Sequence, residues 1–273
     1  MRNYGIAKKT IVPIRKEPEE KGLYIDELLL GMVVEILWED KNNYVFIQTQ
    51  YDYKGYVQME DLFLDSRASK KWKDSIDIVV MGSYVDITED TSFASGILTS
   101  AVRGSYLVGC CKEKSNRIKV KLPDGRAGWV RKKHIKVRKR LDFNLCEMEI
   151  RTNIVEYALL YLYTQFRWGG KSPLGIDSSG LTCMAYLLNE IVIWRDSQFL
   201  QEHFVEISPR DIKKGDVLFF PEHTAIYIGN NRFIHSSGID SGVVIHSLDP
   251  KDDDYKEALA ATLTKVGKYV KFK

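Results

Sequence analysis

Cysteine is scarce in this chain and shows none of the spacings that bind metal. The four cysteines among 273 residues are Cys110, Cys111, Cys146 and Cys183, and only the first two are neighbours. Cysteine-based metal sites usually place two ligands a few residues apart and repeat the pair further along. We therefore expect no metal and no other cofactor, and we interpret the four cysteines as buried thiols.

Long apolar runs and an excess of one charge sign are also missing. No run is long enough to cross a bilayer, and the first residues lack the apolar core of a signal peptide. Forty basic residues oppose 37 acidic ones, which leaves a net charge of +3. The basic cluster over 131–140 is explained by a solvated strand edge and a linker. We expect a cytoplasmic monomer without nucleic-acid or membrane partners, or a secreted or cell-envelope protein if a leader was trimmed.

The first half of the chain repeats itself without gaps. At the offset that separates Gly31 from Gly104, 73 residues, four more pairs coincide: Gly55 with Gly128, Tyr56 with Trp129, Val57 with Val130, and Leu62 with Ile135. Each copy alternates strand-like runs with polar turns. The predicted strands and turns run over 33–38, 39–43 and 44–49 in the first copy and over 106–111, 112–116 and 117–122 in the second. Short strands at regular spacing indicate small antiparallel barrels.

The ends of the two copies, residues 53–57 and 125–130, resemble the closing strands of bacterial SH3-like domains. The resemblance implies two SH3-like barrels, over residues 1–66 and 74–138. We interpret Tyr56 and Trp129 as core aromatics. Because residues 53 and 56 are separated by an odd number, their side chains point to opposite faces of a strand, so Tyr53 is the candidate for an exposed contact.

After residue 138 the pattern changes from strands to helices followed by strands. Residues 144–165 predict a helix with one buried stripe, formed by Ile150, Ile154, Ala158, Leu159, Leu162 and Tyr163. A second helical run covers 181–192, and strands are predicted over 217–220, 224–228, 232–235 and 243–246. Helices that precede an antiparallel sheet make an α+β domain, here residues 144–273.

A glycine-rich turn, Trp168–Leu181, leads into the second predicted helix and places Ser178 at its N-terminus. A nucleophile there is exposed at a turn and feels the positive end of the helix dipole. Asp177 and Ser178 are also preferred helix caps, so the residue types alone leave a capping role open.

Two histidines lie at strand ends in the predicted sheet. His223 precedes the strand 224–228 and His235 closes the strand 232–235, and the Asn230-Asn231 turn makes these strands a hairpin. A helix-terminal nucleophile that faces paired sheet residues allows one histidine to act as a base while a second polar group orients it. The remaining histidines, His134, His203 and His246, are assigned to surface or strand-end positions.

Five segments, in this order, resemble the NlpC family of papain-like cell-wall peptidases. They are Trp168–Pro173, Asp177–Leu181, Gly215–Phe220, His223–Gly229 and Phe233–Ser237. Together with the two SH3-like domains, the chain is similar to γ-D-glutamyl-L-diamino-acid endopeptidases. The resemblance implies hydrolysis of the amide between D-glutamate and the diamino acid of peptidoglycan-derived peptides, with a free N-terminal L-alanine as the preferred substrate end.

The resemblance also assigns roles to individual residues. Ser178 stands where the family has its catalytic cysteine, His223 would be the general base, and His235 would orient it. The backbone N–H of Ser178 would help to hold the oxyanion. The implied substrate-binding residues are Asp177, which would contact the free amine, together with Ser179, Trp168 and Tyr53, the last of which would close the pocket.

Two positions depart from the family pattern. A thiol ionises readily beside an imidazole, whereas a serine hydroxyl must lose its proton during attack, so Ser178 should cripple a site shaped for a thiolate. Phe166 replaces a common tyrosine and lacks its hydroxyl. Cys183 cannot substitute for the missing thiol. It follows Ser178 by five residues, so it lies beyond the first turn of the helix and on another face.

Three functions remain open on these grounds. The first is a peptidase scaffold of this family whose nucleophile was lost naturally or by engineering. The second is a pseudo-enzyme that binds cell-wall peptides without cleaving them, and the third is a working serine hydrolase on the same fold.

Overall fold

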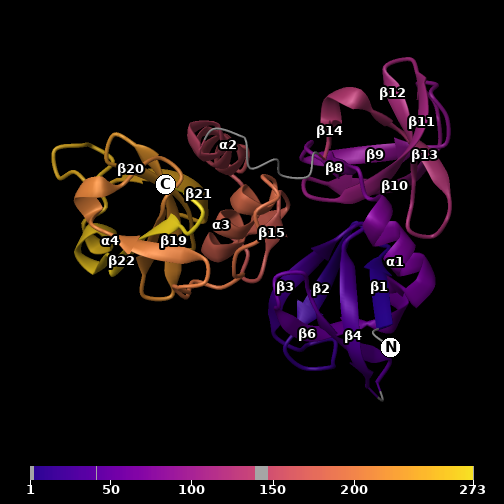
Figure 1. Ribbon diagram of the computed structural model, residues 1–273, viewed down its shortest axis with the longest axis horizontal. Coiled ribbons are helices and arrows are strands. Elements are labelled where there is room, and N and C mark those ends of the chain that lie inside the picture. The colour runs from indigo at the N-terminus through magenta and orange to yellow at the C-terminus, as the bar shows by residue number, and fades with distance from the viewer. Residues whose placement is uncertain (1–2, 41, 139–146, 273) are drawn as a thin grey trace. The chain divides into compact units, whose positions relative to one another are not determined.

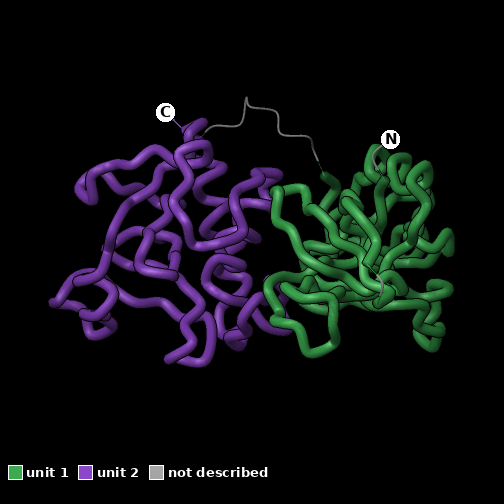
Figure 2. Tube along the Cα trace, turned by 90° about the horizontal axis from the view of Figure 1, so that it is seen from below, with its two compact units in different colours: residues 1–139 green, residues 140–273 purple. Residues whose placement is uncertain are grey.

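Figure 1 shows a computed structural model of the chain, which describes residues 3–40, 42–138 and 147–272. The chain divides into two compact units, residues 1–139 (unit 1) and 140–273 (unit 2), which Figure 2 colours separately. The division between the units falls between the expected domains 74–138 and 144–273, and the expected boundary between the two barrels lies inside unit 1. The expected helical residues 144–146, which include Cys146, lie outside the described residues.

Unit 1 contains two seven-stranded antiparallel sheets of identical strand order. The strands of the first sheet are β1 (Asn3–Ala7), β2 (Ile11–Arg15), β3 (Tyr24–Leu29), β4 (Val33–Glu39), β5 (Tyr44–Gln48), β6 (Lys54–Gln58) and β7 (Leu62–Phe63). Those of the second are β8 (Ile78–Val80), β9 (Tyr84–Thr88), β10 (Ile97–Val102), β11 (Tyr106–Lys114), β12 (Arg117–Lys121), β13 (Ala127–Arg131) and β14 (Ile135–Val137). The order β3-β2-β6-β5-β4-β1-β7 recurs as β10-β9-β13-β12-β11-β8-β14, which confirms the sequence repeat.

The repeated glycines occupy backbone positions that a side chain would disturb. Gly31 and Gly104 have φ angles of 82° and 93°, in the left-handed region that glycine adopts at no steric cost. A Cβ on Gly31 would lie 1.9 Å from the carbonyl oxygen of Tyr106. Gly55 and Gly128 recur because a Cβ at either would meet the γ-methyl of Ile14 or Ile87, at 2.4 and 2.6 Å. The repeat therefore records close backbone approaches.

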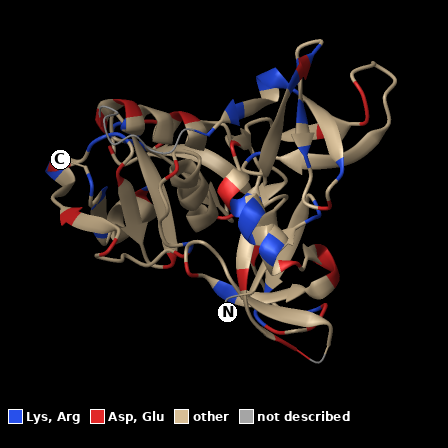
Figure 3. Ribbon diagram, turned by 45° about the vertical axis from the view of Figure 1, so that its right-hand side comes forward, with Lys and Arg blue, Asp and Glu red and all other residues tan. Residues whose placement is uncertain are grey.

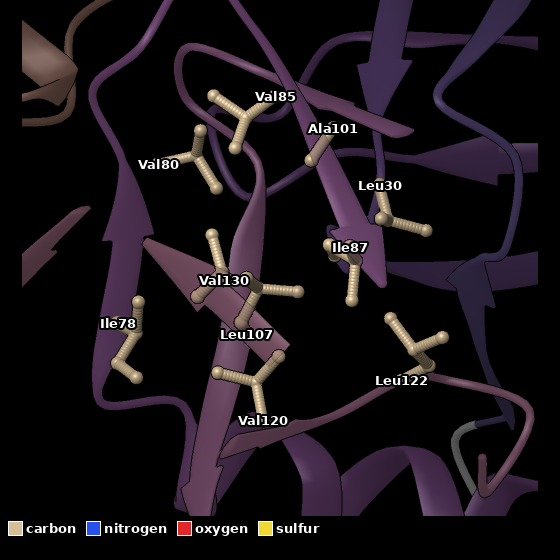
Figure 4. Packing of buried hydrophobic residues seen from close by; sticks show 10 residues of the cluster. All are labelled: Leu30, Ile78, Val80, Val85, Ile87, Ala101, Leu107, Val120, Leu122 and Val130. Carbon is tan, nitrogen blue, oxygen red and sulfur yellow. The ribbon is translucent and has the colours of Figure 1, made fainter. Parts of the chain in front are cut away.

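The two sheets of unit 1 pack against each other. Leu30, from the turn after β3, lies in the core of the second sheet together with Leu107, Val120 and Val130 (Figure 4). The helix α1 (Ser66–Ser75) connects the sheets, and the indole N–H of Trp72 donates to the carbonyl oxygen of Gly31 at 2.9 Å. Short 3-10 helices precede the last strand of each sheet, at Met59–Asp61 and Lys132–His134.

The prediction that Tyr56 and Trp129 are core aromatics is wrong, because both are half-buried. Their neighbours Val57 and Val130 are fully buried, so the two-residue period of a strand turns the aromatic side chains to the other face. Tyr56 lies instead against Phe46, with ring centroids 4.7 Å apart. Tyr53 is half-buried just before β6, and its backbone N–H donates to the hydroxyl of Thr49 at 3.1 Å.

The second strand pair of the repeat also departs from the expectation. β11 continues to Lys114, so only Ser115 and Asn116 of the predicted turn 112–116 form the turn, both at positive φ. Cys110 is half-buried and Cys111 exposed on this strand, which extends past the core. The prediction of buried thiols is therefore wrong for both and holds for Cys183, which is 2% exposed.

Unit 2 is an α+β domain, as expected. Its six-stranded antiparallel sheet has the order β17-β22-β18-β19-β20-β21 and comprises β17 (Phe204–Ile207), β18 (Val217–Phe220), β19 (His223–Gly229), β20 (Arg232–Ser237), β21 (Gly242–Ser247) and β22 (Lys265–Tyr269). The helices are α2 (Glu147–Leu159), α3 (Ser178–Leu187) and α4 (Glu257–Thr262), and a short hairpin joins β15 (Lys171–Ser172) to β16 (Gly175–Ile176). A 3-10 turn at Pro209–Asp211 precedes β18.

The two predicted helices of unit 2 differ from the observed ones at their ends. α2 ends at Leu159, and Leu159 and Tyr163 are 37% and 86% exposed, so they do not belong to the predicted buried stripe. Ile150, Ile154 and Ala158 are buried as expected. Tyr163 has a φ of 66°, which no helix accommodates. α3 begins at Ser178, as predicted, and ends at Leu187 rather than Val192.

Charged residues of both signs are interspersed over both units (Figure 3). Some charged residues are buried. Arg151 of α2 is one of them, and its guanidinium lies 2.7 Å from the carboxylate of Asp216. This ion pair holds α2 against the turn that precedes β18. Within the described residues, no helix has the length and apolar character needed to cross a membrane.

Candidate active site

Ser178 is the first residue of α3, and Asp177 caps that helix. The Asp177 carboxylate accepts from the backbone N–H of Gly180 at 2.6 Å, which is the usual contact of an N-cap side chain. The capping function thus belongs to Asp177, and Ser178 occupies the next position, where the helix dipole favours a developing anion. Ser178 is 7% exposed, so only a small part of its surface is accessible.

Two threonines connect the start of α3 to the strand that carries His223. The hydroxyl of Thr182 donates to the carbonyl oxygen of Ser178 at 3.1 Å and lies 3.2 Å from the hydroxyl of Thr224. Both threonines are buried, and Thr224 directly follows His223 in β19. The first turn of α3 and the start of β19 are therefore held together by a buried polar contact.

Three imidazoles form a continuous hydrogen-bonded row across neighbouring strands. Nε2 of His223 lies 2.8 Å from Nδ1 of His235, and Nε2 of His235 lies 2.9 Å from Nδ1 of His246. His235 is 1% exposed, whereas His223 and His246 are half-buried. The predicted proximity of His223 and His235 is confirmed. His246 lies near the end of β21, as expected, and also joins the row, a contact that the sequence did not predict.

Burial keeps this row neutral at pH 7. It lowers the pKa of His223 to about 4, against which the negative charge of Asp177 acts only weakly. It lowers the pKa of His235 to about 3, assisted by the neighbouring imidazoles. The pKa of His246 is lowered by burial and by the ammonium of Lys256. All three rings are thus available as neutral donors and acceptors.

A buried arginine that sequence reasoning missed organises the turn before α3. Arg195 is 1% exposed, and its guanidinium donates to both carboxylate oxygens of Asp177, at 3.0 and 3.1 Å. It also donates to the hydroxyl of Ser179 at 2.8 Å and to the carbonyl oxygen of Gly170 at 3.1 Å. Asp177 further accepts from the backbone N–H of Gly169 at 2.8 Å. The predicted substrate residues Asp177 and Ser179 are therefore already linked by one cation.

The remaining predicted residues have different surroundings. Trp168, at the start of the turn, is 61% exposed. Phe166 is half-buried, forms a bridge with Ile176, and lies 3.7 Å from the position that a Cβ on Gly238 would take. Tyr53 belongs to unit 1, whereas the other predicted site residues belong to unit 2.

One group of side chains in the described part of the chain has the donor types and spacing of a metal site. The ligand atoms of His235, Asp240 and His246 lie within 4.8 Å of one another. The two imidazoles already share a hydrogen bond, and Asp240 accepts from Ser237 at 2.6 Å and pairs with Lys256 at 3.2 Å. Because the nitrogen and oxygen atoms that would bind a metal already have these partners, we assign no metal to the group.

Ser178 at the start of α3 is linked through Thr182 and Thr224 to the antiparallel sheet that carries the imidazole row, an arrangement that indicates a papain-like peptidase scaffold. Comparison with known proteins agrees: the NlpC/P60 family pattern matches residues 163–259. A dipeptidyl-peptidase 6 of Lysinibacillus sphaericus is 35% identical over 257 residues, which cover 92% of this chain and 94% of that protein. The chain belongs to the NlpC/P60 family.

Two further proteins are similar over different extents. A γ-D-glutamyl-L-lysine dipeptidyl-peptidase of Bacillus cereus is 29% identical over 143 residues, which cover 48% of this chain and 41% of that protein. The crystal structure of an NlpC/P60 family protein from Bacillus cereus has a TM-score of 0.83 at 18% identity, covering 97% of this chain and 99% of that one. The likeness in fold thus extends over both units.

His246 and Arg195 belong to the candidate site and were missed by sequence reasoning. A register argument could have found His246: His235 pairs with Val244, so His246, two residues further, lies on the same sheet face as a diagonal neighbour. Nothing local marks Arg195, because it lies in an irregular segment 18 residues after its main partner, Asp177. Its burial depends on the tertiary structure alone.

Proposed function

We propose that the chain is a peptidoglycan peptide hydrolase scaffold whose site accepts L-Ala-γ-D-Glu-diamino acid peptides. The bond to be cleaved is the amide between the γ-carboxyl of D-glutamate and the diamino acid. The observation that carries the proposal is the position of Ser178 at the start of α3, held by Thr182 and Thr224 to the strand of His223. The names of the two relatives, both dipeptidyl-peptidases, support release of a dipeptide.

The proposed reaction has two acyl-transfer steps. The nucleophile at position 178 attacks the γ-carbonyl carbon, His223 takes the nucleophile's proton, and the oxyanion accepts from the backbone N–H of residue 178. When the intermediate collapses, His223 returns the proton to the departing amine of the diamino acid. Water then attacks the acyl-enzyme with His223 as base. His223 passes that proton to the departing side chain of residue 178 as L-Ala-D-Glu is released, while His235 holds the imidazole of His223 in place.

Serine at position 178 is a poor nucleophile for this site. His223, with a pKa near 4, is a weak base, and it would have to remove a proton from a hydroxyl far less acidic than a thiol. A thiol, with a pKa of about 8.5, presents a much smaller mismatch. We therefore expect the chain as it stands to bind these peptides and to cleave them extremely slowly. Phe166, which has no hydroxyl to place near the carbonyl, adds to this deficit.

The test is the change Ser178→Cys, assayed on L-Ala-γ-D-Glu-diamino acid with product masses identified by mass spectrometry. We expect cleavage at the γ-glutamyl bond at least about 100-fold faster than in the unchanged chain. Ser178→Ala serves as the inert control, and Ser178→Cys combined with His223→Ala should abolish the gain. An N-acetylated peptide should be a much poorer substrate if the free amine is recognised.

A second candidate function is a non-catalytic binder of the same peptides, favoured by the two departures at Ser178 and Phe166. Calorimetric binding of the peptide to the unchanged chain, without any cleavage by the Ser178→Cys variant, would favour this alternative. Combining Ser178→Cys with Phe166→Tyr covers the case in which both groups are needed. Absence of both binding and cleavage in that double variant contradicts the substrate assignment. Turnover by the unchanged chain that depends on His223 would indicate a serine hydrolase.

A further inference from the structure

The row of histidines extends one residue beyond the pair assigned to catalysis. His223, His235 and His246 come from the neighbouring strands β19, β20 and β21, and each contact joins Nε2 of one ring to Nδ1 of the next. A hydrogen bond between two neutral imidazoles needs one protonated and one unprotonated nitrogen. The proton positions on the three rings are therefore coupled.

Only two arrangements of protons satisfy both hydrogen bonds when the rings are neutral. In the first, every ring carries its proton on Nε2, so each donates to the next along the row and His223 keeps a lone pair on Nδ1. In the second, every ring carries its proton on Nδ1 and the donation runs in reverse. Since Nε2 of His223 is occupied by His235, Nδ1 is the nitrogen left for the residue at position 178. Only the first arrangement lets His223 accept a proton there.

We propose that His246 is a positioning residue that sets the tautomer of His235, and through it directs the unprotonated Nδ1 of His223 toward position 178. The inference rests on the proposed function, because it assigns this purpose to the base of that reaction. His246 acts as the final acceptor of the row: its Nδ1 receives the Nε2–H of His235. Without an acceptor, the buried Nε2–H of His235 would lose its partner, which favours the reversed arrangement.

The surroundings of His246 keep it neutral at pH 7. Burial disfavours the protonated form most, the ammonium of Lys256, which precedes α4, adds to this effect, and the carboxylates of Asp240 and Asp254 oppose it. His235 is the titratable neighbour on β20. Protonated His246 would donate from both nitrogens, so His235 would have to accept at Nε2 and place its own proton on Nδ1. His223 would then be left protonated on Nδ1, and the base would be lost at acidic pH.

The first test observes the tautomers directly and needs no turnover. In the unchanged chain labelled with 15N-histidine, long-range 1H–15N spectra at pH 7.5 should show the Nε2–H tautomer for all three rings. His246→Phe should move His235 and His223 toward the Nδ1–H tautomer. His246→Asn, whose side-chain oxygen can replace the Nδ1 acceptor, should preserve the original tautomers even if the phenylalanine variant fails to fold. His203→Phe, a change outside the row, should leave them unaltered.

The second test uses turnover in the Ser178→Cys background. We expect His246→Phe to lower kcat by about 10-fold or more with a smaller change in KM, and His246→Asn to retain activity within about threefold. His246→Asn should also make the acid limb of the pH profile less steep, since one titrating group is removed. If neither Ser178→Cys nor its combination with Phe166→Tyr shows turnover, the proposed hydrolysis fails while the spectra still decide the tautomer assignment. An Nδ1–H tautomer for His235 in the unchanged chain, or unchanged tautomers in a folded His246→Phe, overturns the proposal.

Discussion

The residues that stand out in unit 1 are repeated glycines, whereas those that stand out in unit 2 are buried polar side chains. In unit 1 these residues recur at the 73-residue offset: Gly31 and Gly104 both adopt positive φ, and Gly55 and Gly128 both meet an isoleucine of the neighbouring strand. In unit 2 the buried polar residues around α3 occur once and converge on a single turn. Glycines that recur at one offset indicate a constraint on the backbone. A buried polar cluster that occurs once indicates a functional site, because burying its polar groups is costly.

The largest effect should come from a repeated glycine of unit 1. Gly31→Ala would force a left-handed alanine and drive its Cβ to within 1.9 Å of the Tyr106 carbonyl oxygen, so β11 must move. We expect the free energy of unfolding of unit 1 to fall by about 4 kcal/mol or more, measured by urea denaturation.

Gly125→Ala is the matched control, because Gly125 has a φ of 88° and no atom within 4 Å of its would-be Cβ. Its expected cost is only about 1 kcal/mol, from the conformation alone. Equal losses for the two variants would show that the close approach at Gly31 is unimportant.

The next effect concerns the arginine of unit 2. Arg195→Met removes every donor that the guanidinium directs to Asp177, Ser179 and the Gly170 carbonyl oxygen, so the Asp177 carboxylate loses its cationic partner. We expect a loss of about 3 kcal/mol in the unfolding free energy of unit 2 and faster hydrogen exchange at the start of α3. Lys265→Met, which breaks the exposed pair with Glu206, should cost less than about 0.5 kcal/mol. If Arg195→Met changes neither the unfolding free energy of unit 2 nor the hydrogen exchange at the start of α3, Arg195 does not stabilise the turn.

Acid should weaken unit 2 before unit 1. The pKa values of His223 and His235 are lowered to about 4 and about 3, whereas an unfolded histidine titrates at about 6.5. Below that pH the unfolded state binds protons that the folded state does not, so the stability of unit 2 falls by up to about 1.4 kcal/mol per pH unit for each histidine. This stability is present above about pH 6.5 and is lost progressively as the pH falls to about 4 for His223 and about 3 for His235.

Hydrogen exchange at pH 7, 6 and 5, followed separately in peptides from the two units, measures this difference. Unit 1 contains one of the five histidines, His134, so its response should be shallower. His235→Asn should reduce the pH slope of unit 2, and His134→Gln should not. Identical slopes for both units would contradict the neutral, buried state of the row.

The smallest effect distinguishes the two halves of unit 1. Phe46 stacks on Trp38 with centroids 4.1 Å apart and contacts Tyr56, whereas its counterpart Lys119 lies over the ring of Trp129 at 5.8 Å. Phe46→Ala should cost about 1.5 kcal/mol and Lys119→Ala about 0.5 kcal/mol in thermal unfolding, because a cation–π contact that keeps access to water contributes little. A larger loss for Lys119→Ala would reverse the ranking of these two surfaces.

Much of this molecule could be predicted from local pattern. The repeat at the offset between Gly31 and Gly104 predicted two small antiparallel domains, and the turn before residue 181 predicted Ser178 at a helix start. The burial of Tyr56 and Trp129 was predicted wrongly, although the strand parity of Val57 and Val130 was available. The end of α2 was missed because Leu159 and Tyr163 fit a helical stripe that the chain leaves at a positive φ.

The sequence by itself determined the repeated backbone of unit 1, the α+β order of unit 2 and the pairing of His223 with His235, because glycine, turn and strand preferences act over a few residues. Only the tertiary structure decided that Arg195 is buried against Asp177 and that His246 completes the row of imidazoles. Both contacts join segments whose approach depends on strand register and packing. A buried polar group finds its partner only after those are established.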